Sequence, residues 1–369
     1  MKLLFVTNTS WNIANYRLSL IHSLQEEGHR VHAIAPIDDF SDSLKNKVDS
    51  FSSIQLSRKG TNPFTDFYLF IQLVRLYKRI KPDVIIHYTI KPNIYGSMAA
   101  NWVDIPFVNN VTGLGTVFLH NNLSSRIAKR LYKFSFKKAK TVFFQNNADK
   151  TLFIEQGLCP KPIAQLIPGS GIDTSFFKRE NKISNTLFTF IYIGRMLYDK
   201  GIIELINAIK ILKQEGHSFQ FYFAGQIETD AYLGINQNQL EQWEKEGLIT
   251  YLGLVPNIKT TIESVDCVVL PSYREGTPRA LLEAGSMETP VVATDVPGCQ
   301  EVVIDEKTGF LCKPKNSTSL TNALKKMILL PFEKRAEMGS FSRERIKANF
   351  SDQVISKQYI DLLKTLEQK

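Results

Sequence analysis

The sequence predicts an α/β protein made of two doubly wound domains in tandem. The chain has 369 residues, 43% of them hydrophobic and 22% charged, which is enough for two domains with separate cores. In both halves, apolar runs of strand length alternate with segments of helical periodicity. The runs are apolar at successive positions, as in parallel strands covered by helices on both faces of a sheet.

The first half contains five apolar runs typical of buried strands and two amphipathic segments typical of helices. The expected strands lie at 2–8, 29–36, 83–89, 106–111 and 141–147, and the expected helices at 15–28 and 65–81. The pattern breaks at 168–185, which is rich in Gly, Ser, Pro and Asn. We therefore place the first domain at 1–168.

The pattern restarts after this break, and the second domain is expected at 169–350. Its strands are predicted at 187–195, 219–225, 249–253, 266–272 and 290–298, with a helix at 200–216. The last segment, 351–369, reads as a capped amphipathic helix with no strand after it. We expect it to pack back toward the N-terminal domain.

Composition narrows the class of protein. No apolar run approaches the roughly 18 to 20 residues that span a bilayer, and the N-terminal "MKLLFVTNTS" turns polar too early for a signal peptide. We therefore expect a cytosolic protein. The four cysteines show no paired metal-binding spacing, so we interpret them as reduced and structural.

The positive charge is concentrated in the first half. Residues 1–165 carry 21 Lys and Arg against 11 Asp and Glu, whereas the remainder carries 24 against 25. One segment, 124–140, places five cations at spacings of four and three, which on a helix form one basic stripe: Arg126, Arg130, Lys133, Lys137 and Lys140. Ile127, Leu131 and Phe134 form an adjacent apolar stripe. The basic stripe is either a membrane-docking face or an ordinary solvated one.

In a parallel sheet, ligands bind beyond the carboxyl ends of the strands. The expected strand at 266–272 is followed by "YREGTPRALLEAG", in which Thr277 suits a helix N-cap and Pro278 the first helical position. Such a helix end attracts anions such as phosphate. Glu275 and Glu283 can then line one cleft, or they are plain surface charges.

A second signal is "YIGRMLYDKG", which follows the first strand of the second half. It contains Gly194, Arg195 and Lys200, with the lysine at the start of a helix, where the helix dipole disfavours a cation. A bound diphosphate would offset that cost. The alternative is a salt bridge to Asp199 or Glu204.

These motifs, with "YLGLVPNI", "PVVATDVPGCQEVV" and "GFLC", resemble the retaining nucleotide-sugar glycosyltransferases of family 4 in order and spacing. The resemblance spans essentially the whole chain and implies the GT-B fold, in which two Rossmann-like domains face a central cleft. In the first half, "SRKGTNPF", "KPNIYGSMAANWVDIPFV" and "VTGLGTVF" resemble the subgroup that adds a sugar, often N-acetylgalactosamine, to polyprenyl-diphosphate-linked saccharides. That subgroup builds surface polysaccharides such as O-antigen and capsule, or glycoprotein glycans, at the inner membrane.

The resemblance also implies roles for individual residues. Arg195 and Lys200 would hold the diphosphate of a UDP-sugar, Glu283 the ribose hydroxyls, and Glu275 the donor sugar. The remaining donor contacts would come from backbone at Gly194, Gly276 and Thr277 and from Val255, which would pack on the uracil. No metal or other cofactor is expected, because cations and helix ends neutralise the leaving group. The acceptor would bind the first domain.

The first half departs from the family at two places. Many members carry a Gly-Gly loop after the first strand, where this chain has "NTSWNIANYRL", so the backbone around Asn15 is a less certain phosphate contact. Many also carry a His after the fourth strand, where this chain has Thr112 and Gly113. His87 and Lys91 are further candidates for the acceptor, against ordinary structural or surface roles.

The sequence also bears on three other classes of protein. A nicotinamide-dependent oxidoreductase would need a Gly-x-Gly-x-x-Gly turn after the first strand, which is absent. Only charge suggests a nucleic-acid binder, because no aromatic platform accompanies it. A non-catalytic sugar-nucleotide sensor or scaffold stays open, since a fold does not imply turnover.

Overall fold

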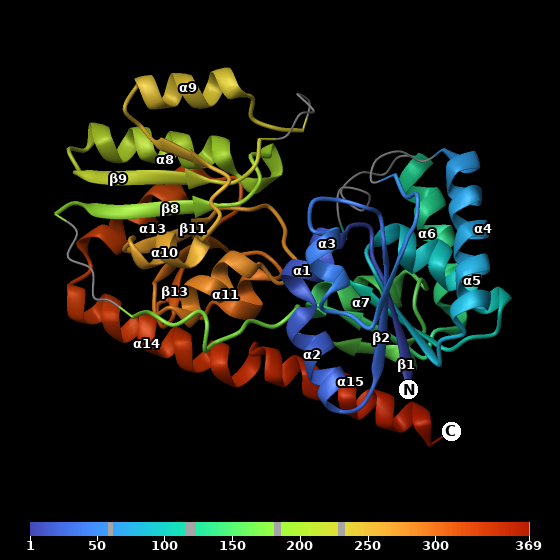
Figure 1. The fold of residues 1–369 in the computed structure, drawn as a ribbon. Coiled ribbons are helices and arrows are strands. Elements are labelled where there is room, and N and C mark those ends of the chain that lie inside the picture. Colours follow the sequence, from blue (N-terminus) through green and yellow to red (C-terminus); the bar gives the residue numbers. More distant parts are fainter. Residues whose placement is uncertain (58–61, 115–122, 181–185, 228–232, 369) are drawn as a thin grey trace. The chain divides into compact units, whose positions relative to one another are not determined.

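A computed structural model describes residues 1–57, 62–114, 123–180, 186–227 and 233–368. The polypeptide divides into two compact units (Figure 1). The first unit comprises Met1–Gly171 and Asp352–Lys369, and the second Ile172–Ser351. The division falls within three residues of the boundaries expected at 168 and 350, and the C-terminal segment belongs to the first unit.

The first unit is built on a seven-stranded parallel sheet in the order β3-β2-β1-β4-β5-β6-β7. The strands are β1 (Lys2–Val6), β2 (Arg30–Ala35), β3 (Ser50–Ser53), β4 (Val84–Tyr88), β5 (Phe107–Val111), β6 (Thr141–Phe144) and β7 (Ala164–Leu166). The chain order reverses between β1 and β4. In a doubly wound sheet, the crevice at such a reversal is where ligands bind.

Helices cover both faces of this sheet. One face packs against α1 (Ser10–Tyr16), α2 (Leu18–Glu26), α3 (Ser41–Lys45) and α15 (Asp352–Glu367). The other packs against α4 (Pro63–Ile80), the π-helical turn η1 (Pro92–Gly96), α5 (Ser97–Trp102), α6 (Leu123–Ser135), the short 3₁₀ turn η3 (Phe136–Lys138) and α7 (Asn147–Glu155). A further 3₁₀ turn, η4 (Lys161–Ile163), precedes β7. Both sheet faces are therefore apolar, as the sequence predicts.

The second unit contains a six-stranded parallel sheet in the order β10-β9-β8-β11-β12-β13. Its strands are β8 (Phe188–Ile193), β9 (Phe219–Ala224), β10 (Thr250–Gly253), β11 (Cys267–Leu270), β12 (Val291–Thr294) and β13 (Gly309–Cys312). Its helices are η5 (Tyr198–Lys200), α8 (Ile202–Gln214), α9 (Gln237–Lys245), α10 (Ile258–Glu263), α11 (Arg279–Ser286), α12 (Cys299–Val302), α13 (Ser317–Leu329) and α14 (Phe332–Asn349). Here the chain order reverses between β8 and β11.

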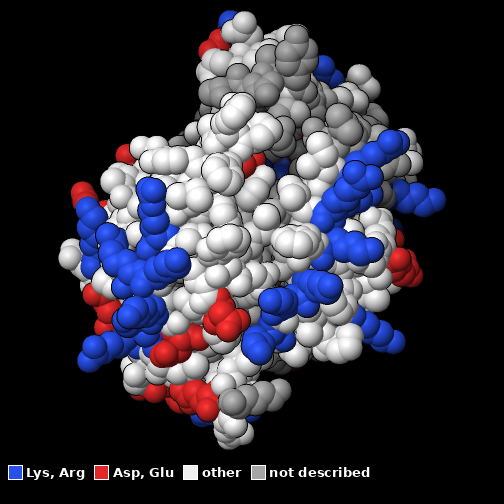
Figure 2. Space-filling model, turned by 90° about the vertical axis from the view of Figure 1, so that its right-hand side faces the viewer, with Lys and Arg blue, Asp and Glu red and all other residues white. Residues whose placement is uncertain are grey.

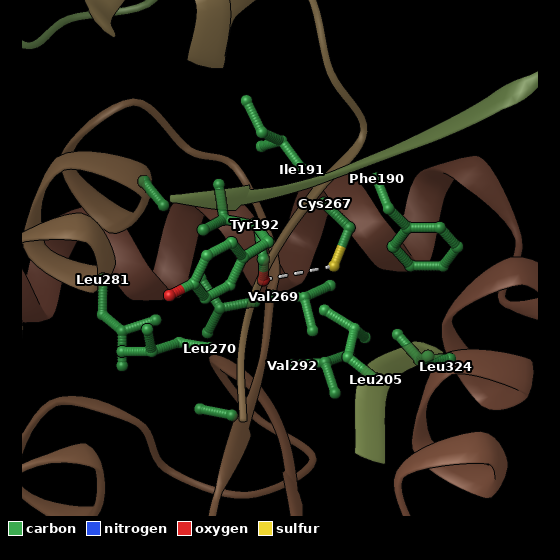
Figure 3. Close-up of a cluster of buried hydrophobic side chains, with 14 of the residues drawn as sticks. Phe190, Ile191, Tyr192, Leu205, Cys267, Val269, Leu270, Leu281, Val292 and Leu324 are labelled. Atoms are coloured by element: carbon green, nitrogen blue, oxygen red, sulfur yellow. Dashed lines mark hydrogen bonds between the residues drawn. The ribbon is translucent and has the colours of Figure 1, made fainter. Parts of the chain in front are cut away.

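The core of the second unit includes side chains of β8 and β11, the two strands at this reversal. Figure 3 shows side chains of β8, α8, β11, α11, β12 and α13 meeting in it, with Tyr192, Cys267 and Leu281 among them. All four cysteines of the chain are buried free thiols. Burial raises the pKa of Cys159 and Cys312 to about 12, which keeps these thiols protonated and unreactive at neutral pH.

The structure contains strands that the sequence pattern did not predict. β3 and β7 lie at the two edges of the first sheet and have polar sequences, SFSS and AQL, so neither produces an apolar run. The helix expected at 15–28 is in fact two helices, because Arg17 adopts a non-helical conformation (φ −126°, ψ −7°) between α1 and α2. Among the described residues, no helix is both long enough and apolar enough to span a bilayer.

Candidate donor and acceptor sites

The strongest candidate site lies at the chain reversal of the second unit, where β8 and β11 are neighbours. The two motifs that the sequence singled out follow these two strands. Gly194 and Arg195 come directly after β8, and the segment Ser272–Thr277 connects β11 to α11. Because the carboxyl ends of parallel strands share one edge of the sheet, both motifs lie at the same edge.

An ion pair joins the two motifs. Lys200 Nζ donates to Glu275 Oε1 at 2.6 Å, and the side chains are only 19% and 14% exposed. A backbone hydrogen bond connects the same two loops: Tyr273 N donates to Asp199 O at 2.9 Å. The lysine thus pairs with Glu275 rather than with Asp199 or Glu204, which were the alternatives. Residues 75 positions apart are brought together at the place where a diphosphate was expected.

Glu283 is a buried residue of α11. Its side chain is 10% exposed, and Oε1 accepts a hydrogen bond from Arg279 Nε at 2.8 Å. Burial raises the pKa of Glu283 above its ordinary value of 4.5, while the Arg279 charge and hydrogen bond act in the opposite direction. A buried carboxylate held by one cation is not plain surface charge. The alternative that Glu275 and Glu283 are both plain surface charges is therefore wrong.

The start of α11 differs from the sequence expectation by one residue. The N-cap is Pro278 (φ −73°, ψ 116°) rather than Thr277, the first helical residue is Arg279, and no side chain caps the helix. Proline at the N-cap has no side-chain acceptor for the first N–H groups of the helix. The N-cap side chain therefore does not cover this end of α11, whose positive dipole end attracts an anion.

Two glycines that are not among the predicted site residues support the two motifs. Gly298, just before α12, has φ +88°, and a Cβ there would lie 2.1 Å from Gly276 O. Gly201, which follows Lys200, has φ +70°, and a Cβ would lie 2.1 Å from Pro271 O. Only glycine accepts both the backbone conformation and this close approach. In the sequence, each of these glycines ends a short segment that is typical of a turn, "DVPG" or "DKG".

The other proposed donor contacts lie at the same edge of the sheet. Arg195 O accepts a hydrogen bond from Tyr192 OH at 2.7 Å, and Gly194 N donates to Ala224 O at 2.9 Å. Val255 is half-buried two residues beyond β10 and packs against the core of the unit. Gly194 and Arg195 directly follow β8 and Val255 closely follows β10, so the strands position these residues.

In the first unit, Lys91 is already paired. Its Nζ donates to Asp66 Oδ1 at 2.6 Å, and Tyr95 OH donates to Asp66 Oδ2 at 2.9 Å. Asp66 belongs to α4, so this pair ties α4 to the turn after β4. The side chains are 15% and 9% exposed, which excludes the interpretation of Lys91 as a plain surface lysine. An acceptor phosphate would have to share Lys91 with Asp66.

His87 is completely buried at the end of β4. Nε2 lies 3.0 Å from Tyr77 OH and Nδ1 lies 3.0 Å from Asn109 Oδ1. Burial lowers the pKa of His87 to about 3, although the hydrogen bond to Asn109 favours the charged form, so the ring is neutral at pH 7. The structure therefore supports a satisfied core histidine rather than contact with a sugar.

The segment after β1 is helical rather than a loop. Asn15 lies within α1, which Thr9 caps by accepting from Asn12 N at 3.0 Å, and the Asn15 side chain donates to Trp11 O. Its backbone N–H is therefore in a helix and does not replace the Gly-Gly loop of the family.

Thr112 and Gly113 are half-buried just beyond β5, at the same sheet edge as the turn after β4. Parts of "SRKGTNPF" and "VTGLGTVF", at 58–61 and 115–118, fall outside the described residues.

The turn after β4 contains a feature that sequence reasoning missed. Thr89 has φ +70°, a conformation that costs a β-branched residue energy, and its hydroxyl is buried with no partner among the described residues. The π-helical turn η1 follows within three residues. Both features recur at functional sites. They mark this strand end, beside the chain reversal of the first sheet, as the candidate acceptor site.

The basic stripe is exposed but only partly helical. All five side chains are exposed. However, α6 ends at Ser135, Lys137 lies in η3 and Lys140 lies beyond it. The single helical stripe over five cations is therefore wrong in detail: Arg126, Arg130 and Lys133 share the helix. The adjacent apolar stripe divides as well, because Leu131 is partly buried whereas Ile127 and Phe134 are 49% and 63% exposed.

Two doubly wound parallel sheets, each with candidate ligand contacts at its reversal, define a class of two-domain α/β proteins. Solved structures share this fold over almost the whole chain. They include a glycosyltransferase from Rickettsia africae ESF-5 (TM-score 0.82, 18% identity, covering 100% of this chain and 99% of that one). Another is Alr3699/HepE of Anabaena in complex with UDP (TM-score 0.79, 20% identity, covering 99% and 100%).

Sequence families identify the protein further. The model for glycosyl transferases group 1 matches residues 173–345, and that for glycosyl transferase 4-like proteins matches residues 2–146. Together the two matches span most of the chain. The chain therefore belongs to the glycosyltransferases that these two models describe, and it has the GT-B fold.

Two curated relatives align over most of the chain. One is the N,N'-diacetylbacillosaminyl-diphospho-undecaprenol alpha-1,3-N-acetylgalactosaminyltransferase of Campylobacter jejuni subsp. jejuni serotype O:2. It is 26% identical, and the alignment covers 98% of each chain. The other is the capsular polysaccharide biosynthesis glycosyltransferase CapM of Staphylococcus aureus, which is 23% identical over 85% of this chain and 84% of its own.

Proposed function

We propose that this protein transfers N-acetylgalactosamine, or another hexosamine, from a UDP-sugar to a polyprenyl-diphosphate-linked saccharide, with retention of anomeric configuration and without a metal. The observation that carries the proposal is the meeting of Lys200 and Glu275 at the reversal of the second sheet. The buried Glu283 lies on the adjoining helix. Cations, an uncapped helix start and carboxylates at one sheet edge suit a nucleotide sugar.

The relatives support the choice of partners. The Campylobacter jejuni protein is named for transfer of N-acetylgalactosamine to a diphospho-undecaprenol-linked sugar. An Escherichia coli relative, 26% identical over 78% of this chain, is named as a UDP-Gal:alpha-D-GlcNAc-diphosphoundecaprenol alpha-1,3-galactosyltransferase. A polyprenyl-diphosphate acceptor fits the surplus of cations in the first half of the chain. Assembly of O-antigen, capsule or a glycoprotein glycan is the corresponding process.

Residues of the second unit would divide the work on the donor. Lys200 and Arg195 neutralise the diphosphate as it gains charge, and the backbone of Gly276 and Thr277 supports the sugar and phosphates. Glu275 faces the sugar while remaining within reach of Lys200. Val255 packs on the uracil, with the backbone of its turn reading the edge of the base.

Glu283 would bind the ribose. Its carboxylate accepts from Arg279 in this structure, and ribose hydroxyls are further donors that need an ionised acceptor. Binding of the nucleotide thus favours the charged form of Glu283, against the desolvation that raises its pKa.

Retention follows from attack on the front face. The acceptor oxygen forms its bond to the anomeric carbon on the side where the bond to UDP breaks, and the departing phosphate takes the hydroxyl proton. We assign no protein nucleophile. Within the described ranges, no three His, Cys, Asp or Glu side chains gather as metal ligands. Metal independence remains a prediction, and activity that persists in EDTA is its test.

The first unit would hold the acceptor at the ends of β4 and β5, with Lys91 sharing its charge between Asp66 and a phosphate. Thr112 and Gly113 lie at the same edge. A lipid-linked acceptor resides in a bilayer, so the protein would associate peripherally with the cytoplasmic face of the inner membrane. The exposed cations of α6 and η3 would contribute about 1 kcal/mol each at an anionic surface.

The test is UDP release from a panel of UDP-sugars, with a synthetic polyprenyl-diphosphate-linked monosaccharide as acceptor. A transferase releases UDP from one or two of the donors. The release is fast only when the acceptor is present. The second candidate, a non-catalytic sugar-nucleotide sensor, rests on the fact that the fold alone does not imply turnover. Binding of a UDP-sugar without release of UDP under any condition would favour the sensor.

A further inference from the structure

The first unit exposes a group of aromatic side chains that the donor and acceptor sites do not use. Phe64, Phe67 and Tyr68 of α4 are 86%, 65% and 50% exposed, and Trp102 at the end of α5 is 71% exposed. We call these four residues the aromatic patch. Scattered apolar residues are ordinary on a surface, whereas a contiguous group of large aromatics marks an interaction site.

The patch is contiguous and ordered. Phe64, Phe67 and Tyr68 lie three and four positions apart, which places them on one face of α4. Phe70, which is partly buried, links the two helices. Its ring centroid lies 6.3 Å from that of Phe67 and 6.3 Å from that of Trp102, the latter in an edge-to-face arrangement. The rings of α4 and α5 thus form one surface supported from below by the core of the unit.

Cations border this surface. Arg75 and Lys78 lie seven and ten positions after Tyr68, which continues the same face of α4, and both are exposed. Arg130 and Lys133 are exposed on α6, which covers the same sheet face as α4 and α5. Figure 2 looks onto the side of the molecule that carries α4–α6 in Figure 1. It shows Lys and Arg to the left and right of an uncharged area, with Asp and Glu at its lower left.

We infer that the aromatic patch inserts into the headgroup–acyl boundary of an anionic bilayer and anchors the first unit there. Aromatic rings with apolar bodies favour this boundary, and flanking cations favour anionic headgroups. The combination fits a lipid surface better than a protein partner, whose interface would place acidic side chains opposite the cations.

The inference deepens the proposed function, since it rests on an acceptor that is carried by a membrane lipid. It also changes which residues do the anchoring. The basic stripe of α6 and η3 supplies attraction that salt screens, whereas the aromatic patch supplies burial that salt does not screen. Association should therefore have a salt-sensitive part and a salt-resistant part that belong to different helices.

The anchor has a geometric consequence for catalysis. Asp66 lies on α4 between Phe64 and Phe67, and it holds Lys91 at the turn after β4. The start of α4 therefore carries three of the aromatic residues and, through Asp66, contacts the candidate acceptor turn. Insertion of this end of α4 would bring Lys91 close to the membrane plane, where the diphosphate of a polyprenyl lipid lies.

The experiment uses the full-length protein and vesicles of phosphatidylcholine and phosphatidylglycerol without any polyprenyl lipid. Three proteins are compared by co-sedimentation at low and high salt: wild type, a patch variant (Phe64→Ser, Phe67→Ser, Tyr68→Ser) and a stripe variant (Arg130→Glu, Lys133→Glu, Lys137→Glu). The control is Phe332→Ser, which removes a comparably exposed aromatic (57%) from α14 of the second unit.

We expect the patch variant to bind at least roughly tenfold more weakly at both salt concentrations, because three rings no longer leave water. The stripe variant should lose binding mainly at low salt, and Phe332→Ser should bind like the wild type. Vesicles with brominated acyl chains should also quench the fluorescence of wild-type Trp102, and the Trp102→Phe variant should lose that quenching.

Equal binding by the patch variant and the wild type would overturn the inference, as would the absence of quenching by brominated lipid. Self-association of the wild type that the patch variant lacks, without vesicle binding, would assign the patch to a second copy instead. Activity on a water-soluble acceptor analogue distinguishes a failure of the membrane-anchoring inference from a failure of the proposed function. Retention of that activity in the patch variant would show that loss of anchoring leaves transfer intact.

Discussion

At the scale of single residues, the site is defined by two charge pairs with different partners. Lys200 is joined to Glu275 across two loops, whereas Glu283 is joined to Arg279 within one helix. The first pair can open toward a diphosphate, because its members come from separate strand ends. The second pair is buried, so Glu283 can gain a ribose hydroxyl as a further partner without leaving its helix.

This difference predicts that two isosteric substitutions affect different steps, nucleotide binding and turnover. Glu283→Gln should weaken UDP and UDP-sugar alike by roughly 10- to 150-fold, the usual cost of losing a charge-assisted hydrogen bond. Glu275→Gln should leave UDP affinity unchanged and lower turnover, because Glu275 is proposed to face the sugar. Titration calorimetry with UDP, together with steady-state kinetics, separates the two effects. Wild-type values in both variants would contradict the assignment.

The cations are expected to act in the transition state. Arg195→Ala and Lys200→Ala should lower kcat more than they raise KM, because the diphosphate gains charge as the glycosidic bond breaks. Lys210→Ala is the matched control, since Lys210 also forms an ion pair, with Glu246, but on the exposed surface of the unit. If the two site variants melt early and keep full specific activity, the residues only support the fold.

At the scale of elements, the turn before α12 holds the loop that carries Glu275. Gly298→Ala adds a Cβ 2.1 Å from Gly276 O and forces that loop to move. Gly216→Ala is the matched control, because Gly216 also has positive φ (+84°) but has nothing within 4 Å of the added Cβ. The positive φ should cost each variant about 1 kcal/mol of stability, and Gly298→Ala should lose more, because its Cβ also clashes with Gly276 O. Only Gly298→Ala should lose activity, by roughly tenfold or more; equal activities would contradict the role of this turn.

Strand β4 predicts a dependence of stability on pH. Burial lowers the pKa of His87 from 6.5 to about 3, so between these values the unfolded chain binds a proton that the folded protein does not. The free energy of unfolding should therefore fall with decreasing pH, by up to ~1.4 kcal/mol per pH unit from this residue.

Chemical denaturation of wild type and His87→Gln at a series of pH values measures that slope. The variant should be less stable at pH 7, because the network with Tyr77 and Asn109 is altered, yet its stability should depend less on pH. His32, whose pKa burial lowers to about 4, contributes equally to both proteins and cancels in the difference. Parallel pH profiles would contradict a buried neutral His87.

The strands show which elements a sequence can predict. Strands that are apolar on both faces, such as VIIHY of β4, stand out because the whole run is buried. The edge strands β3 and β7 do not, since their pairing comes from a neighbouring strand rather than from their own side chains. The limits of α1 and α6 were missed for a similar reason: a change of backbone conformation at Arg17 or after Ser135 leaves the helical periodicity intact.

At the scale of the whole molecule, the order of the motifs along the chain predicted the fold and the family, because each motif follows a strand at the ligand-binding edge of its sheet. What the sequence could not supply were pairings between distant segments. The choice of Glu275 as the partner of Lys200, and of Asp66 as the partner of Lys91, depends on which strand ends become neighbours. The exposure of the aromatic patch depends likewise on which face of α4 the core covers.

The proposed activity joins a sugar from a UDP-sugar to a polyprenyl-diphosphate-linked saccharide. The most direct measurement is mass spectrometry of the lipid-linked product after incubation with each UDP-sugar in EDTA, with Glu275→Gln in parallel. We expect one added hexosamine, such as N-acetylgalactosamine, with a preferred donor, an unchanged diphosphate, and strongly reduced product with the variant. An unmodified acceptor with every donor, or equal product from Glu275→Gln, would contradict it.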